Sequence, residues 1–157
     1  MATVKVKNQP YRHFGETVPY GNVTTLVFRL TTNEEGAVKP SDSEELKDGD
    51  VIDLGALPGG LRLDDAQIIV TKGLTESVTG SLGFAYEDGE DVEGSEEDAA
   101  YFGAGLNLAA EGRVRAQGSK LITLPKPARL LLTIAGADNA KDSEIAVLIT
   151  GEVVGMD

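Results

Sequence analysis

The chain has one histidine, His13, as a candidate base for acid–base or nucleophilic chemistry. A nucleophilic centre needs a base beside the nucleophile, and His13 lies in a proline-flanked segment away from any expected strand end. Cysteine is absent, which removes thiolate metal sites, a disulfide framework and cysteine nucleophiles together. A histidine-based triad and a multi-histidine metal site are excluded by count. We therefore interpret His13 as a solvated or packed ring, predict no catalytic residues and expect that the chain is not an enzyme.

Carboxylates are abundant, and they are densest in residues 87–98. A glycosidase holds two acids in a rigid cleft, whereas these acids share one loop in a chain with no Trp, four Tyr and four Phe. Calcium is the better functional alternative, because hard cations favour several carboxylate oxygens around a turn. The EF-hand spacing is not met, since Val92 follows Asp88 and Glu90 and the glycine falls one position late. We interpret the run as a solvated loop that charge repulsion keeps extended, and leave cation binding open.

Two glycine-rich segments, LPGGL (57–61) and FGAGLNL (102–108), share only their composition with phosphate-binding loops. Neither is followed by the Gly-Lys-Ser/Thr of a P-loop, and neither lies between a strand and a helix. Both are predicted to be turns. The sequence therefore indicates no metal site and no cofactor.

The first 22 residues combine basic and aromatic side chains. Residues 2–7 alternate as a half-buried strand does, and prolines and glycines interrupt any regular element from residue 8 to residue 22. Aromatic residues and arginine are favoured at protein interfaces. The candidate interaction residues are Lys5, Lys7, Tyr11, Arg12, Phe14 and Tyr20. Their aromatic rings either cap the end of their own domain, or belong to an arm that adds residues 2–7 to a sheet edge of a neighbouring subunit.

Short strands are expected to position these groups. Helical periodicity is hard to find, and 19 glycines and six prolines separate short apolar runs. Strands are predicted over residues 24–31, 50–54, 61–72, 77–86, 112–117, 120–124, 129–135 and 144–154. Residues 99–102 are expected to form one helical turn capped by Asp98. The last two strands are apolar on both faces and are placed centrally. Spacings of roughly ten residues are typical of an antiparallel sandwich or barrel.

The length and the net charge of the chain further limit its domain organisation and its classes of binding partner. The 157 residues fit one domain, which we divide into an extended N-terminal arm, residues 1–22, and a single sandwich, residues 23–157. The net charge of −12 argues against nucleic-acid binding, which needs clustered Lys and Arg. No apolar run approaches the ~18 residues of a membrane helix, and none has signal-peptide length. We expect a protein that is made in the cytoplasm and has no membrane partner.

The order of segments in residues 49–154 resembles that of the capsid decoration, or cement, proteins of tailed bacteriophages. It runs from GDVIDLGALPGGLRLDDAQIIVTKG and TGSLGFAYEDG through DAAYFGAGLNLAAEGRVRA to LITLPKPARLLLTIAGAD and EIAVLITGEVV. The resemblance covers about two-thirds of the chain. It depends on the order and general character of these segments and not on an invariant motif. It implies an all-β jelly-roll sandwich, often a homo-trimer, bound to the major capsid protein on the outer surface of the virion. It supplies no catalytic residue, and the role of the N-terminal segment is our own inference.

Two functions of different classes remain open at this point. The first is a structural virion protein that decorates and stabilises a phage capsid. The second is a head-fibre or receptor- or carbohydrate-binding β-sandwich module. Sugar-binding faces usually present Trp or Tyr platforms, and here Trp is absent and three of the eight aromatic residues lie in the N-terminal segment. This distribution favours the first function.

Overall fold

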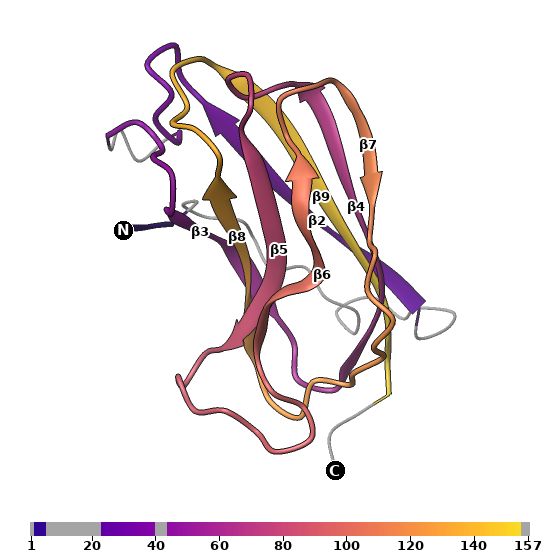
Figure 1. Cartoon of the computed structure of the whole chain (residues 1–157). Helices are drawn as coiled ribbons and strands as arrows, with labels where there is room; N and C mark the ends of the chain where they lie inside the picture. The colour runs from indigo at the N-terminus through magenta and orange to yellow at the C-terminus, as the bar shows by residue number, and fades with distance from the viewer. Residues whose placement is uncertain (1, 6–22, 40–43, 155–157) are drawn as a thin grey trace.

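The computed structural model describes residues 2–5, 23–39 and 44–154, and they fold into two facing β-sheets (Figure 1). The strands are β1 Thr3–Lys5, β2 Val23–Thr32, β3 Val51–Leu57, β4 Leu61–Lys72, β5 Thr79–Tyr86, β6 Asp98–Asn107, β7 Gly112–Arg115, β8 Ala128–Ala135 and β9 Ser143–Val153. Within these ranges the structure contains no helix with the length and apolarity needed to cross a membrane. The predicted all-β sandwich is confirmed.

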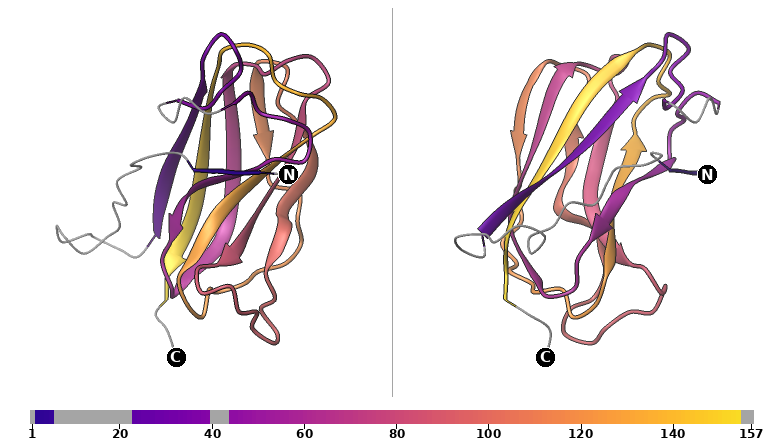
Figure 2. Two further views of the ribbon diagram at one scale, coloured as in Figure 1. Left: turned by 90° about the vertical axis from the view of Figure 1, so that its left-hand side faces the viewer. Right: turned by 180° about the vertical axis from the view of Figure 1, so that it is seen from behind.

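The two sheets are built from strands that are not consecutive in the chain. One sheet has the order β1-β3-β8-β5-β6 and the other the order β2-β9-β4-β7. All pairings are antiparallel except that of β1 with β3, which is parallel. Figure 2 shows the two layers edge-on and from behind, with β9 in yellow beside β2 in indigo. As predicted, the last two strands are central: β8 lies between β3 and β5, and β9 between β2 and β4.

Strict alternation along these central strands builds the core. Every second residue of β8 is buried between the sheets, and so is every second residue of β9 except at its C-terminal end. The reason is that successive side chains of a strand point to opposite faces of the sheet. The inward residues are Leu130, Leu132 and Ile134 of β8, and Ile145, Val147 and Ile149 of β9. Each is at most 1% exposed, and each contributes roughly 1.5–3 kcal/mol by leaving water.

Residues 99–102 do not form the predicted helical turn. They belong to β6, so the glycine-rich segment 102–108 is mostly strand and not a turn. Asp98 Oδ1 accepts a hydrogen bond from the N–H of Ala100 at 2.9 Å, a local contact like that of a helix cap. The chain nevertheless continues as a strand that pairs with β5 across two register shifts. These bulges bury the neighbouring Tyr101 and Phe102 together, and so hide the period-two pattern.

The predicted strand at residues 120–124 is also wrong, because only an isolated bridge, between Arg62 and Thr123, forms there. The Tyr101 hydroxyl takes over part of the role of a strand partner. It accepts a hydrogen bond from the N–H of Ile122 at 3.0 Å and donates one to the carbonyl of Lys120 at 2.9 Å. Burial raises the pKa of Tyr101 above its ordinary value, so the hydroxyl stays protonated at neutral pH. The glycine turn predicted at residues 57–61 is confirmed.

Candidate interaction surface

Of the six residues predicted to make interactions, the structure describes Lys5. Lys7, Tyr11, Arg12, Phe14 and Tyr20, and also His13, lie outside the described residues. Lys5 is the exposed last residue of β1, which pairs in parallel with β3 of the same chain. The predicted strand at the N-terminus therefore exists over three residues and does add to a sheet edge. Exchange of that strand between subunits stays a prediction.

The start of β1 is held by Asp50, which is 6% exposed. Its carboxylate accepts hydrogen bonds from the N–H groups of Ala2 and Lys47, each at 2.9 Å. Burial raises the pKa of Asp50, but these two backbone hydrogen bonds outweigh it, and the net pKa lies below the ordinary value. The charged carboxylate thus joins β1 to the loop that precedes β3.

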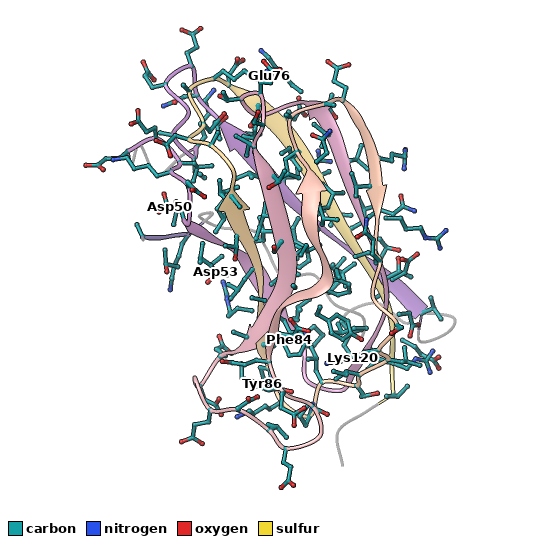
Figure 3. All side chains as sticks on the ribbon, in the orientation of Figure 1. Asp50, Asp53, Glu76, Phe84, Tyr86 and Lys120 are labelled. Carbon is teal, nitrogen blue, oxygen red and sulfur yellow. The ribbon has the colours of Figure 1, made fainter. Side chains whose placement is uncertain are left out.

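A second acid, Asp53, lies within β3, three residues after Asp50 (Figure 3). It is 5% exposed and forms an ion pair with Arg129 of the adjacent β8, with Nε 3.0 Å from Oδ1. Asp53 is also the register partner of Lys5. The outer face of this sheet therefore carries a neutralised pair beside the one described basic candidate.

The acidic loop between β5 and β6 is folded and not extended as predicted. Its own carboxylates accept hydrogen bonds from its backbone: Asp91 Oδ1 from the N–H of Glu97 at 2.7 Å, and Glu97 Oε2 from the N–H of Tyr86 at 3.1 Å. Lys126 Nζ donates to both oxygens of Asp88 at 2.7–2.8 Å. The prediction of an extended loop is wrong because carboxylates can fold a loop by accepting hydrogen bonds from its N–H groups.

Lys126 is the cation that neutralises part of this loop. Its Nζ lies 4.8 Å from the centre of the Tyr86 ring, within the range of a cation–π contact, and the hydrogen bond to Asp88 lowers the pKa of that carboxyl. Among the residues that the structure describes, no group of three or more His, Cys, Asp or Glu side chains is placed to hold a metal ion.

The opposite end of the sandwich carries a shallow depression of about 480 Å³, near Glu76 (Figure 3). Its ionisable lining residues are Glu76 and Lys141. Close by, the fully buried Asn139 accepts from the N–H of Thr75 at 3.1 Å and donates to the carbonyls of Lys141 and Gly36 at 2.9 and 3.3 Å. One side chain thereby ties three loops together and makes this end rigid.

Acidic residues crowd both ends of the sandwich. One end has the eight acids of residues 87–98. The loops of the other end carry Glu34, Glu35, Glu44, Glu45, Asp48, Glu76, Glu111, Asp138 and Asp142. Between these acidic ends, the outer face of one sheet carries acidic and basic side chains in balance.

The sheet β2-β9-β4-β7 is seen in Figure 2, right. Its outer face carries most of the described arginines, and we call it the arginine face. Four of the five arginines in the described residues point outward on it. Lys72 of β4, the register partner of Glu144, is exposed on the same face and forms an ion pair with Asp142 at its border. With this pair included, five acids match five cations, so the net formal charge of the face is zero in a chain of −12. The charged members are Arg29, Arg62, Lys72, Arg113 and Arg115, with Asp64, Asp65, Asp142, Glu144 and Glu152.

Apolar side chains lie among these charges. On β2 the outward Val23 and Val27 are 64% and 49% exposed. Leu148 is the register partner of Val27 on β9, and Ala146 of β9 is the register partner of Ile69 on β4. This surface was not predicted, although the four-residue spacing of Val23 and Val27, twice the period of a strand, places both on one strand face.

Comparison with known proteins identifies solved structures that share the fold. No family model matches the chain, and no curated protein matches it. A chain of the capsid of Ralstonia phage GP4 matches with a TM-score of 0.66 at 20% identity, covering 99% of each chain. A chain of the cyanophage Pam1 capsid matches with a TM-score of 0.60 at 12% identity, covering 94% of this chain and 97% of that one. A chain of the Helicobacter pylori bacteriophage KHP30 capsid matches with a TM-score of 0.48 at 15% identity over 83% of this chain and 89% of that one.

Proposed function

We propose that this chain is a structural protein of a phage virion that decorates the outer capsid surface and stabilises it by binding the major capsid protein. The observation that carries the proposal is the sharing of one fold over almost the full length of chains from two phage capsids. The resemblance in residues 49–154 supports the same role independently of the fold comparison.

The proposed fold type is a jelly roll with one added strand. Without β1, the two sheets have the orders β3-β8-β5-β6 and β2-β9-β4-β7. In each, one of the last two strands returns to lie between two earlier strands, β8 between β3 and β5 and β9 between β2 and β4, which is the arrangement of two Greek keys in an eight-stranded jelly roll. Viral capsid domains commonly use this fold.

The role needs no chemistry, and we propose that the chain is neither an enzyme nor a cofactor-binding protein. A decoration protein must be stable alone, present a shell-binding surface and keep virions apart. The acidic ends of the sandwich suit the last requirement, because like charges oppose association between particles. We assign shell binding to the basic N-terminal residues, with Lys5 among them.

A homo-trimer would strengthen such binding. Three copies that engage three shell contacts turn the second and third contacts into intramolecular events with a high effective concentration. Weak individual contacts then produce near-permanent attachment.

The sugar-binding alternative gains no support from the described aromatic residues. All five of them are buried, which leaves no stacking platform in this part of the chain. They are Phe28, Phe84, Tyr86, Tyr101 and Phe102.

Co-sedimentation with purified phage heads that lack this protein tests the proposal. We expect the full chain to pellet with mature heads at saturating stoichiometry, and to raise the temperature at which they release DNA. A Lys5→Glu variant should bind more weakly, whereas Lys39→Glu, a change of the same charge at an exposed loop site, should bind normally. Binding to a glycan array without binding to heads would replace this function with the receptor-binding one.

A further inference from the structure

The arginine face combines three features that solvent-facing sheet surfaces seldom share. It has zero net charge on a strongly acidic protein, it exposes large apolar side chains, and it is bordered by a long edge strand. Exposed apolar groups mixed with arginine are typical of protein interfaces.

Several side chains of this face already have polar partners within it. Arg62 forms ion pairs with Asp64 at 2.5 Å and with Glu152 at 3.0 Å. Arg115 Nη2 lies 2.7 Å from Asp65, and Arg113 Nη1 donates to the side-chain oxygen of Gln67 at 3.1 Å. Guanidinium groups are weakly hydrated and tolerate burial in ion pairs better than ammonium groups. Covering the face would therefore leave neither Arg62 nor Arg115 buried without a carboxylate partner.

Residues 37–39 of the same chain cover the end of the edge strand β2, through the bridge of Val38 with Thr32 and the hydrogen bond from the N–H of Lys39 to the carbonyl of Thr31. Over residues 23–30, no other described residue protects this edge by the usual devices. The strand is ten residues long and pairs with β9 in continuous register, with no bulge. Its sequence, VTTLVFRLTT, has no proline, glycine or lysine. In natural sheets an edge this long and regular is normally blunted or covered, which indicates that a partner lies against it.

Charge decides which partner fits. Two copies of a chain with net charge −12 repel each other wherever their acidic ends approach. The arginine face has no net charge to repel a second copy, and it carries positive and negative groups in equal number, so it can complement a surface of the same composition. An unrelated acidic or basic partner would find no excess charge there to bind.

We propose that the arginine face, with β2 at its edge, is the surface through which copies of this chain contact one another. The proposal names the contact surface of the oligomer in the proposed function and rests on that part of it. It is separate from the shell-binding role assigned to the N-terminal residues. Covering this face would bury Val23 and Val27 and the outward side of β2.

Sedimentation velocity of the full chain, from about 1 to about 100 µM, tests the proposal. We expect the wild type to be oligomeric, and Val27→Glu and Val23→Glu each to raise the dissociation constant about 100-fold, because each would bury an unpaired carboxylate. Leu121→Glu is the matched control: Leu121 is 65% exposed but lies in the loop before β8, so its association should not change. The same far-UV circular dichroism and a cooperative thermal transition in all four proteins will show that the variants fold; the midpoints of the dissociated variants need not equal that of the oligomer.

Salt supplies a second readout. Association through a neutral face of an acidic protein should strengthen as salt screens the repulsion between copies, whereas shell binding by basic residues should weaken. A monomeric wild type, or equal association of Val27→Glu and Leu121→Glu, overturns the proposal. So does a Val27→Glu variant that stays oligomeric but no longer binds heads, since the face would then belong to the shell. If Val27→Glu dissociates the oligomer while the wild type binds no heads, the capsid role fails and the contact surface stands.

Discussion

Replacing Tyr101 with Phe removes one hydroxyl and keeps the ring, which packs edge-on against Phe84 at 5.5 Å and Phe102 at 4.8 Å. The hydroxyl is the hydrogen-bond partner of the N–H of Ile122 and of the carbonyl of Lys120. Both groups belong to the segment that joins β7 to β8 and has no ladder of its own. Loss of the hydroxyl should therefore weaken the attachment of this segment to the sandwich.

The size of the effect follows from the number of groups that lose a partner. An unsatisfied, partly buried N–H costs about 1–2 kcal/mol, and losing the bond to the carbonyl adds about 0.5–1 kcal/mol. We expect Tyr101→Phe to lower the free energy of unfolding by about 2 kcal/mol, which corresponds to a drop in Tm of about 4–8 °C for a domain of this size. Urea unfolding followed by far-UV circular dichroism measures the first quantity, and calorimetry measures the second.

Tyr86→Phe is the matched control, because it makes the same chemical change on the adjacent strand. The Tyr86 hydroxyl donates one hydrogen bond, to the carbonyl of Ser95 in the acidic loop, at 2.5 Å, and losing it should cost about 0.5–1 kcal/mol. Equal losses in the two variants, or a loss below about 0.5 kcal/mol for Tyr101→Phe, would refute the reasoning. The segment would then be held by the burial of Leu124 and its backbone contacts with β4.

Three further predictions concern other parts of the fold. Asp50 has a lowered pKa, so its charged form stabilises the fold above its unfolded pKa of about 3.9, and this stability is lost as the pH falls through the folded pKa. Asp50→Asn should unfold at lower urea than the wild type at pH 7, and the difference should shrink at pH 3; a constant difference would exclude the charge as the cause. Lys126→Gln should speed proteolysis within residues 87–98 without moving the global Tm, because Lys126 ties Asp88 to the body of the protein; unchanged cleavage rates would show that the backbone hydrogen bonds of the loop suffice. Gly83→Ala should cost more than about 3 kcal/mol or prevent folding, because the added Cβ would lie 2.0 Å from the carbonyl oxygen of Asp98, whereas Gly89→Ala, at an open loop position, should cost far less in the same urea titration.

Strand positions were predictable wherever pairing leaves the local alternation intact. The segment ARLLLTIA of β8 buries every second residue, so its period shows in the sequence and its central position follows from its apolar outer side. The same holds for β9. The predicted range of residues 61–72 also coincides with the observed β4, although two register shifts interrupt its pairing with β9.

The errors fall where one segment depends on another for its hydrogen bonds. Residues 99–102 looked like a helical turn because Asp98 can cap one, and the pairing with β5 that makes them a strand is remote in sequence. Residues 120–124 looked like a strand, but a single tyrosine hydroxyl supplies part of their pairing. Neither interaction leaves a local pattern in the chain.

The candidate surfaces, too, were predictable only where the local sequence carries the signal. The acidic run was evident from composition, yet the hydrogen bonds between its carboxylates and its own backbone were not. The basic N-terminal residues were predicted as an interaction segment, and the structure describes Lys5 among them. The arginine face was not predicted at all, since Arg29, Arg62 and Arg115 are separated by 33 and 53 positions in the sequence.

The sequence by itself determined the all-β class, the burial of the last two strands and the acidic run at residues 87–98, because alternation and composition are properties of neighbouring residues. Only the tertiary structure decided that β2, β9, β4 and β7 lie side by side in one sheet. That order brings arginines from three of the strands together with acids and exposed valines on one neutral face. The physical reason is that sheet order depends on which strands pair across long loops, and hydrogen-bonding groups of the backbone are the same in every strand.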